Sequence, residues 1–180
     1  MDIGTISFRY AKALFSLAID KGQGNQVYQN MKMLSDNFLN EDKLEEALAN
    51  PLVSAATKEK LLIAAGGINV SDLYLRFIRL VLEHRRESYL PFFAHSYIEL
   101  YRKEKKITRV LFTTAVPTDK TIEEHLKEKL HDETGYTIEF VGRVNPKLIG
   151  GFQLQIGNYR LDASYASQLR NIRSQLLDRK

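Results

Sequence analysis

The sequence predicts a mainly α-helical fold in two domains, a six-helix bundle over residues 1–106 and a small α+β domain over residues 107–180. Apolar side chains recur with the 3.6-residue period of an α-helix through most of the first hundred residues. After Lys106 the chain is rich in β-branched and aromatic residues that alternate as in a strand. A length of 180 residues with 44% hydrophobic residues is enough for one ordinary domain or two small ones.

Helix-breaking residues delimit the helices of the first domain. The periodic pattern is interrupted at five places, and most of these interruptions contain glycine, asparagine or proline. The five interruptions separate six segments. Ser54 and Ser71 stand where N-caps are needed, and Pro91 is tolerated in a first turn because its missing N–H would have no partner there. We therefore expect helices at 3–20, 25–39, 42–49, 55–65, 72–86 and 89–105.

The second domain is predicted to have the element order βαβββα. Pro117 ends a first strand, Asp119 caps a charged helix, and Gly135 ends that helix. Gly157-Asn158 has the composition of a two-residue hairpin turn. We expect strands at 107–116, 136–144, 152–156 and 159–161, with helices at 118–133 and 164–178.

The composition excludes several classes of protein. Every apolar stretch is shorter than the roughly 18 residues that a membrane span needs, so no transmembrane helix is predicted. The start of the chain has no basic segment followed by an apolar one, as a signal peptide would have. The chain has no cysteine, which excludes disulfides, thiolate nucleophiles and cysteine-based metal centres. These features predict a cytoplasmic protein.

The net charge of +4 is too evenly spread to predict a nucleic-acid partner. Residues 1–106 carry 15 basic and 13 acidic side chains, and residues 107–180 carry 11 and 9. The densest basic runs, Arg85-Arg86 and residues 102–106, lie at predicted helix ends, where they face the negative end of the helix dipole. The mild basicity still leaves an RNA-binding bundle as an alternative.

No catalytic residue, metal site or cofactor site is predicted. No two of the four histidines have the i, i+4 spacing that would place two imidazoles together on a helix. The motifs of nucleophile elbows, dinucleotide-binding folds and P-loops are absent from the sequence. Gly150-Gly151 is better interpreted as a tight entry into the hairpin.

Two of the predicted helices, 3–20 and 72–86, have more apolar surface than a surface helix normally buries. Either both lie at the centre of the bundle, or an exposed groove between them accepts an amphipathic partner helix; the pattern leaves both open. The first helix has two apolar flanks, one formed by Ile6, Tyr10, Ala13, Leu14 and Leu17, the other by Phe8, Ala11, Phe15, Ala18 and Ile19.

The second domain is small enough to need outside support. With roughly 75 residues and no disulfide, its core supplies only a few kcal/mol. The last helix carries an apolar stripe that either binds a partner or packs on the domain's own sheet. The stripe consists of Leu169, Ile172, Leu176 and Leu177.

Several segments resemble, in the same order, those of one protein family. They are residues 7–15 (SFRYAKALF), Asn50-Pro51 followed by 58–62, 77–86, and 148–157 (LIGGFQLQIG) followed by 161–164 and Leu169. The Gly-Gly hairpin and the Asp-x-Ser segment before the last helix are the most specific. Over nearly its whole length the chain is similar to the delta subunit of F-type ATP synthases, called OSCP in mitochondria. Phe152 and Tyr165 depart from the smaller aliphatic residues common in the family.

The resemblance implies a non-catalytic stator subunit that links the catalytic head to the peripheral stalk. In this family the first domain binds the N-terminal helix of one alpha subunit between its first and fifth helices, and the second domain joins the b subunits. We accordingly expect the alpha-subunit groove to involve Phe8, Ala11, Phe15, Ile19, Phe77, Leu80 and Val81, and the b-subunit contact to involve Leu169, Ile172, Leu176 and Leu177.

The resemblance also implies a location. We expect membrane association only through the complex, at the cytoplasmic face of a bacterial inner membrane, without nucleic acid or cofactor. The competing interpretations are a free-standing helical adaptor or RNA-binding bundle and, with no motif behind it, a small enzyme.

Overall fold

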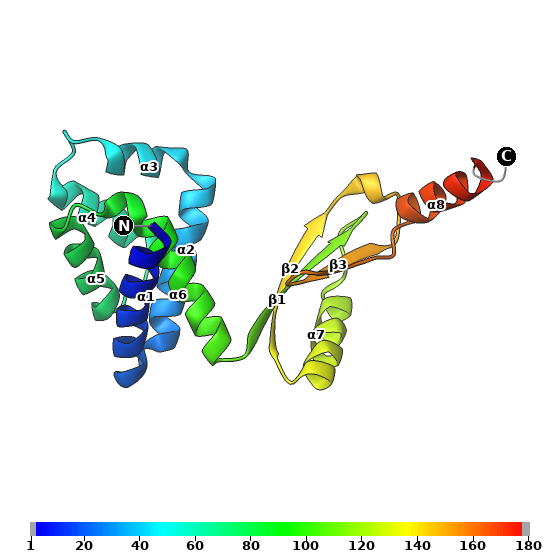
Figure 1. The fold of residues 1–180 in the computed structure, drawn as a ribbon, viewed down its shortest axis with the longest axis horizontal. Helices are drawn as coiled ribbons and strands as arrows, with labels where there is room; N and C mark the ends of the chain where they lie inside the picture. The colour runs from blue at the N-terminus through cyan, green and yellow to red at the C-terminus, as the bar shows by residue number, and fades with distance from the viewer. Residues whose placement is uncertain (1–2, 178–180) are drawn as a thin grey trace. The chain divides into compact units, whose positions relative to one another are not determined.

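The computed structural model describes residues 3–177 and divides the chain into two compact units, one ending at Glu104 and the other beginning at Lys105. The chain is mainly helical, with a small four-stranded sheet in its C-terminal part (Figure 1). This division lies two residues before the boundary expected from the sequence. Among the described helices, none combines the length and the apolar character needed to cross a membrane.

The first unit is built from helices that follow the predicted periodicity. Their buried side chains include large residues such as Tyr28, Tyr74, Phe93 and Tyr97. The helices are α1 (Ile3–Asp20), α2 (Gly24–Asn40), α3 (Asp42–Ala49), α4 (Ala55–Ala65), α5 (Asp72–Glu83) and α6 (Leu90–Glu104), with a 3₁₀ turn, η1 (Glu87–Tyr89), before α6.

Helix α5 ends three residues before the predicted end at Arg86. Arg85 has φ 53°, a left-handed conformation, and the Arg86 N–H donates to the Val81 carbonyl at 2.9 Å. This is the hydrogen bond that closes a helix through a left-handed residue. No glycine, asparagine or proline stands between Glu83 and Pro91, so the sequence contains no helix-breaking residue that marks this stop.

Side-chain caps and one buried amide fix the start of α5. Ser71 accepts a hydrogen bond from the Tyr74 N–H at 3.2 Å, as predicted, and Ser54 caps α4 in the same way. The buried Asn30 donates to the carbonyls of Gly66 and Asn69 and accepts from the Ser71 N–H. Asn30 therefore holds the α4–α5 loop against α2, which sets the position of α5.

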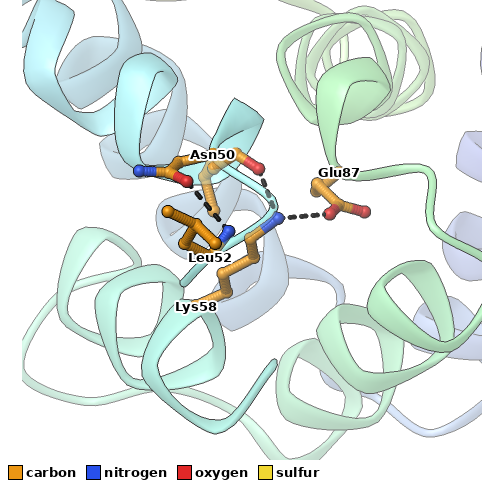
Figure 2. Close-up of polar contacts among 5 residues, drawn as sticks. Asn50, Leu52, Lys58 and Glu87 are labelled. Atoms are coloured by element: carbon orange, nitrogen blue, oxygen red, sulfur yellow. Dashed lines mark hydrogen bonds and ion pairs between the residues drawn. The ribbon is translucent and has the colours of Figure 1, made fainter. Parts of the chain in front are cut away.

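A part-buried ion pair joins α3, α4 and η1 (Figure 2). The Lys58 ammonium donates to the Leu48 carbonyl and to Glu87 Oε1, the latter at 2.7 Å. Burial opposes ionisation of Glu87, but the hydrogen bond and charge of Lys58 prevail, so the pKa of Glu87 lies below its usual value. Lys58 is buried and Glu87 is partly buried, so removing one partner would leave the charge of the other largely shielded from water and unpaired.

The second unit has the element order predicted for it. A 3₁₀ turn, η2 (Pro146–Leu148), is added between the second and third strands. The elements are β1 (Ile107–Thr114), α7 (Lys120–Thr134), β2 (Thr137–Val144), β3 (Phe152–Ile156), β4 (Tyr159–Asp162) and α8 (Tyr165–Leu177). Strand β1 ends two residues early because the Thr114 hydroxyl donates to the Val116 carbonyl and turns the chain.

The sheet has the strand order β2-β1-β3-β4. Strands β1 and β2 run parallel and are joined through α7, which packs on β2, while the other pairs are antiparallel. The core of the unit is small: Phe112 is buried, and its ring lies 5.4 Å from that of Phe140 and 5.5 Å from that of Phe152. Helix α8 continues beyond the sheet (Figure 1).

The ion pair gives a prediction about stability. Lys58→Met should destabilise the first unit by about 2–4 kcal/mol, because it leaves the Glu87 carboxylate and the Leu48 carbonyl without their donor. Urea unfolding followed by circular dichroism would measure this. Lys60→Met, at an exposed position of the same helix, is the matched control and should change stability by less than about 0.5 kcal/mol. Equal effects of the two substitutions would contradict a structural role for the pair.

Candidate partner-binding sites

An open apolar groove lies between α1 and α5. Its volume is about 1010 Å³. The sequence left two explanations for the large apolar surface of these helices. The structure supports the exposed groove and not the alternative that both helices are central and fully buried. Its apolar lining is formed by Ile6, Tyr10, Ala13, Leu14 and Leu17 from α1 and by Leu73, Phe77 and Leu80 from α5.

Aromatic rings form a rigid floor for this groove. Tyr10 stacks on Phe93 of α6 with ring centroids 4.9 Å apart and an interplanar angle of 5°. Phe77 meets both rings edge-on, at 6.5 Å and 5.9 Å. Arg86 donates to the Tyr10 hydroxyl at 2.8 Å, and its guanidinium carbon lies 5.3 Å from the centre of the ring. The floor is thus fixed before any partner binds, which lowers the entropic cost of binding.

The rim of the groove combines exposed aliphatic and basic side chains. Leu17 and Leu80 are 44% and 43% exposed. The ionisable residues that line the groove, apart from Tyr10, are all basic types, and no aspartate or glutamate is among the described lining residues. These basic residues are Arg9, Lys12, Arg76, His84 and Arg86.

The structure brings only part of the predicted contact set to this groove. Phe77 and Leu80 line the groove, whereas Phe8, Ala11, Phe15, Ile19 and Val81 do not. Ala11 and Val81 are fully buried, so no partner could reach them. The Phe15 ring packs edge-on against Tyr97 of α6 at 5.9 Å. Phe8 and Ile19 are exposed but outside the groove.

Tertiary packing turns the Phe15 flank of α1 away from the groove, because Phe15 packs on Tyr97 of α6. Both flanks are equally apolar in the sequence, so the sequence alone does not say which of them lines the groove. The groove is lined by the other flank, where Tyr10, Leu14 and Leu17 lie. A possible signal was that this flank contains Tyr10, whose hydroxyl needs a polar partner and finds it in Arg86.

The apolar stripe of α8 is exposed in the second unit. Leu169, Ile172 and Leu176 are 56%, 54% and 66% exposed, so the alternative that the stripe packs on the unit's own sheet is wrong for these three residues. The fourth predicted residue, Leu177, ends α8, and its side chain lies outside the described residues. Sequence reasoning missed Tyr165, which is exposed and extends the stripe to the spacing four, three, four that is typical of helix–helix seams.

Two adjacent glycines allow α8 to begin close to the hairpin. Gly151 has φ +71°, and a Cβ there would lie 2.2 Å from the Ala163 carbonyl oxygen. A Cβ on Gly150 would lie 2.5 Å from the ring of Tyr165. The backbone also pairs here, because the Tyr165 N–H donates to the Gly150 carbonyl at 3.0 Å. The glycine pair is therefore required by the approach of α8, which refines the prediction of a tight entry into the hairpin.

The Asp162 carboxylate fixes the first turn of α8. It accepts hydrogen bonds from the Ser164 N–H and hydroxyl, from the Ser167 hydroxyl and from the Gln153 amide, at 2.6–3.0 Å. Ser164 in turn accepts from the Ser167 N–H and caps the helix. Hydrogen bonds from Ser164 and Ser167 favour the ionised form and lower the pKa of Asp162 to about 2.

Within residues 3–177, no group of three or more histidine, aspartate or glutamate side chains is arranged to hold a metal ion. The features that the structure assembles are apolar surfaces suited to binding helices.

The family model of the ATP synthase delta (OSCP) subunit matches residues 6–176. The chain belongs to this family. It is 64% identical to the ATP synthase subunit delta of Parabacteroides distasonis over the full length of both chains. It is 44% identical to that of Phocaeicola vulgatus, covering 98% of this chain and 96% of the relative, and 33% identical to the chloroplastic subunit of Porphyra purpurea, covering 97% and 94%.

A solved structure shares the fold. A chain in the cryo-electron microscopy structure of the Toxoplasma gondii mitochondrial ATP synthase hexamer matches with a TM-score of 0.65 and 24% identity, covering 95% of this chain and 97% of that one. Membership of the delta (OSCP) family makes this chain a structural, non-catalytic subunit of ATP synthase with a stator role, linking the head to the peripheral stalk. The function predicted from the sequence is thereby confirmed.

The low pKa of Asp162 gives a pH prediction. Because the folded-state pKa is depressed, the carboxylate's support for α8 is complete above pH 4 and is lost as the pH falls through about 2. Asp162→Asn should reproduce the acid behaviour at neutral pH, with faster hydrogen exchange at the amides of Ser164 and Ser167. Asp119→Asn, which removes the charge of the α7 cap in the same way, is the control and should leave those amides unchanged. Unaltered exchange in Asp162→Asn would refute the assignment.

Proposed function

We propose that the groove between α1 and α5 binds the N-terminal helix of an ATP synthase alpha subunit, and that α8 binds the b subunits of the peripheral stalk. The observation that carries the first contact is the exposed apolar groove with its preformed aromatic floor. Its lining on α1 runs from Ile6 to Leu17, a span of about 16 Å at 1.5 Å per residue. That length accommodates about three turns of a partner helix.

The two contacts are assigned to the two units. The six helices of the first unit serve as the head-binding bundle, within residues 1–106, and the small α+β unit, within residues 107–180, serves the stalk. The stripe of Tyr165, Leu169, Ile172 and Leu176 supports the second contact, because its spacing suits one helix packing along another.

A stator joint must not release either partner while the rotor turns. Burial of apolar surface in a preformed groove favours slow dissociation, since affinity differences between related complexes lie mainly in the off-rate. Two contacts in one chain also raise the effective concentration of each partner for the other. No residue of such a joint takes part in ATP chemistry, and the coupling of ion translocation to ATP synthesis depends on the joint holding.

The complex that contains this subunit is associated with a membrane. We place the chain at the cytoplasmic face of a bacterial inner membrane, held there by its partners. The bacterial sources of the similar delta subunits, Parabacteroides distasonis and Phocaeicola vulgatus, support this location.

Substitutions in the groove test the first contact. Leu80→Asp and Leu17→Asp should each weaken binding of an alpha-subunit N-terminal peptide by about 2–4 kcal/mol, because the apolar contact would be lost and a charged carboxylate would have to be desolvated under the bound helix. Both side chains are partly exposed, so circular dichroism of the free protein should stay the same. Fluorescence anisotropy with a labelled peptide measures the affinity.

The matched control is Phe8→Asp, which places the same charge at an equally exposed position of α1 outside the groove. It should leave the affinity unchanged. A loss in Phe8→Asp as large as in Leu80→Asp would move the contact to the other flank of α1.

The second contact is tested by Ile172→Asp in α8. Depleted membranes reconstituted with this variant should fail to form an ATP-driven ion gradient, while its binding of the alpha peptide stays intact, because the contacts lie on separate units and should be additive. Asn171→Asp adds the same charge to α8 off the stripe and should restore the gradient as the wild type does. A full gradient with Ile172→Asp would contradict a stalk contact at this stripe.

A further inference from the structure

The basic rim of the groove suggests a requirement on the charge of its occupant. Arg9 and Lys12 lie on the α1 side and Arg76 on the α5 side, and all three are exposed. The acidic residues of these helices, Asp20, Asp72 and Glu83, are not among the lining residues. An occupant of the groove is therefore bordered by positive charge on both sides.

The three rim cations make no hydrogen bond or ion pair with the described residues of the chain. Two nearby arginines differ in this respect. Arg79, on α5 but outside the groove, pairs with Glu59 at 2.7 Å, and Arg86 is bound to the Tyr10 hydroxyl. The unpaired cations thus coincide with the edge of the apolar groove, where a bound helix would place its flanking side chains.

We infer that the groove selects an amphipathic helix whose apolar seam is flanked on both sides by aspartate or glutamate. This inference rests on the proposed function and specifies the partner of the same site. The apolar floor would supply most of the affinity, and the rim would supply specificity and a faster association rate. A helix with lysine or arginine at the flanking positions would be rejected by like-charge repulsion.

The contribution of the rim should be modest and sensitive to salt. Exposed ion pairs are each worth a few tenths of a kcal/mol up to about 1 kcal/mol, so three of them change affinity by about tenfold. Exposed charges are screened over about 10 Å at 0.1 M salt and over about 3 Å at 1 M salt. The preference for acidic flanks should therefore shrink as salt rises, while the apolar contact persists.

The test uses the full-length chain and three synthetic peptides with one apolar seam and with glutamate, glutamine or lysine at the flanking positions. A hydrocarbon staple on the solvent side gives the three peptides the same helicity. At 50 mM salt, fluorescence anisotropy should show the glutamate peptide binding about tenfold more tightly than the glutamine peptide, with the lysine peptide weakest. At 1 M salt the three affinities should converge.

Charge reversal in the protein provides the matched comparison. The double variant Lys12→Glu, Arg76→Glu should reverse the order of the glutamate and lysine peptides. Lys43→Glu, Lys60→Glu changes the net charge equally at exposed positions outside the groove and should preserve the wild-type order. Reversal in both double variants would mean that net charge rather than the rim decides, and would overturn the inference.

The remaining outcomes separate the inference from the proposed function. Equal affinities of the three peptides at low salt, all abolished by Leu80→Asp, would refute the acidic-flank requirement and leave the groove as the partner site. Binding of the alpha-subunit peptide without binding of the glutamate peptide would likewise refute the acidic-flank requirement and leave the groove as the partner site. If neither of these peptides binds, both the inference and the proposed groove contact are wrong.

Discussion

The stacking of Tyr10 on Phe93 is the interaction on which the groove depends. It ties α1 to α6, and because Phe77 meets both rings edge-on, the same cluster holds α5 in place. Arg86 secures the exposed edge of Tyr10 through its hydroxyl and its ring face. Tyr10 thereby anchors the flank of α1 that lines the groove, while Leu17 of the same flank stays exposed. The proposed partner site is therefore an exposed apolar surface of fixed shape, as is typical of interaction sites.

The two candidate contacts differ in form. In the first unit the partner site is a hollow, with its apolar floor buried and a rim of basic side chains. In the second unit it is an exposed ridge along α8 whose direction is set at one end by Asp162, Ser164 and the glycine pair. The shape of the first candidate site is therefore fixed by the floor of the groove, and the direction of the second is fixed at the start of α8.

Much of the fold could be predicted because its signals are local. Helix periods, the caps at Ser54, Ser71 and Asp119, and the Gly157-Asn158 turn each depend on a few neighbouring residues. What could not be predicted depends on contacts distant in sequence: the flank of α1 that lines the groove is set by the packing of Phe15 on Tyr97 and of Tyr10 on Phe93. The early end of α5 depends on the left-handed Arg85, a conformation that arginine does not favour. The exposure of α8 could not be predicted either, because the sequence pattern of an apolar stripe is the same whether the chain itself or a partner covers the stripe.

Cross-linking in the assembled ATP synthase would show most directly what touches the groove. The chain has no cysteine, so Leu80→Cys, Phe8→Cys and Ile172→Cys each provide a single site for a photoreactive benzophenone. After irradiation of the assembled complex, mass spectrometry should identify the N-terminal segment of an alpha subunit joined to position 80, a b subunit joined to position 172, and no alpha-subunit N-terminal segment at position 8. Attachment of that segment at position 8 and its absence at position 80 would contradict the central claim that the open groove between α1 and α5 receives the head.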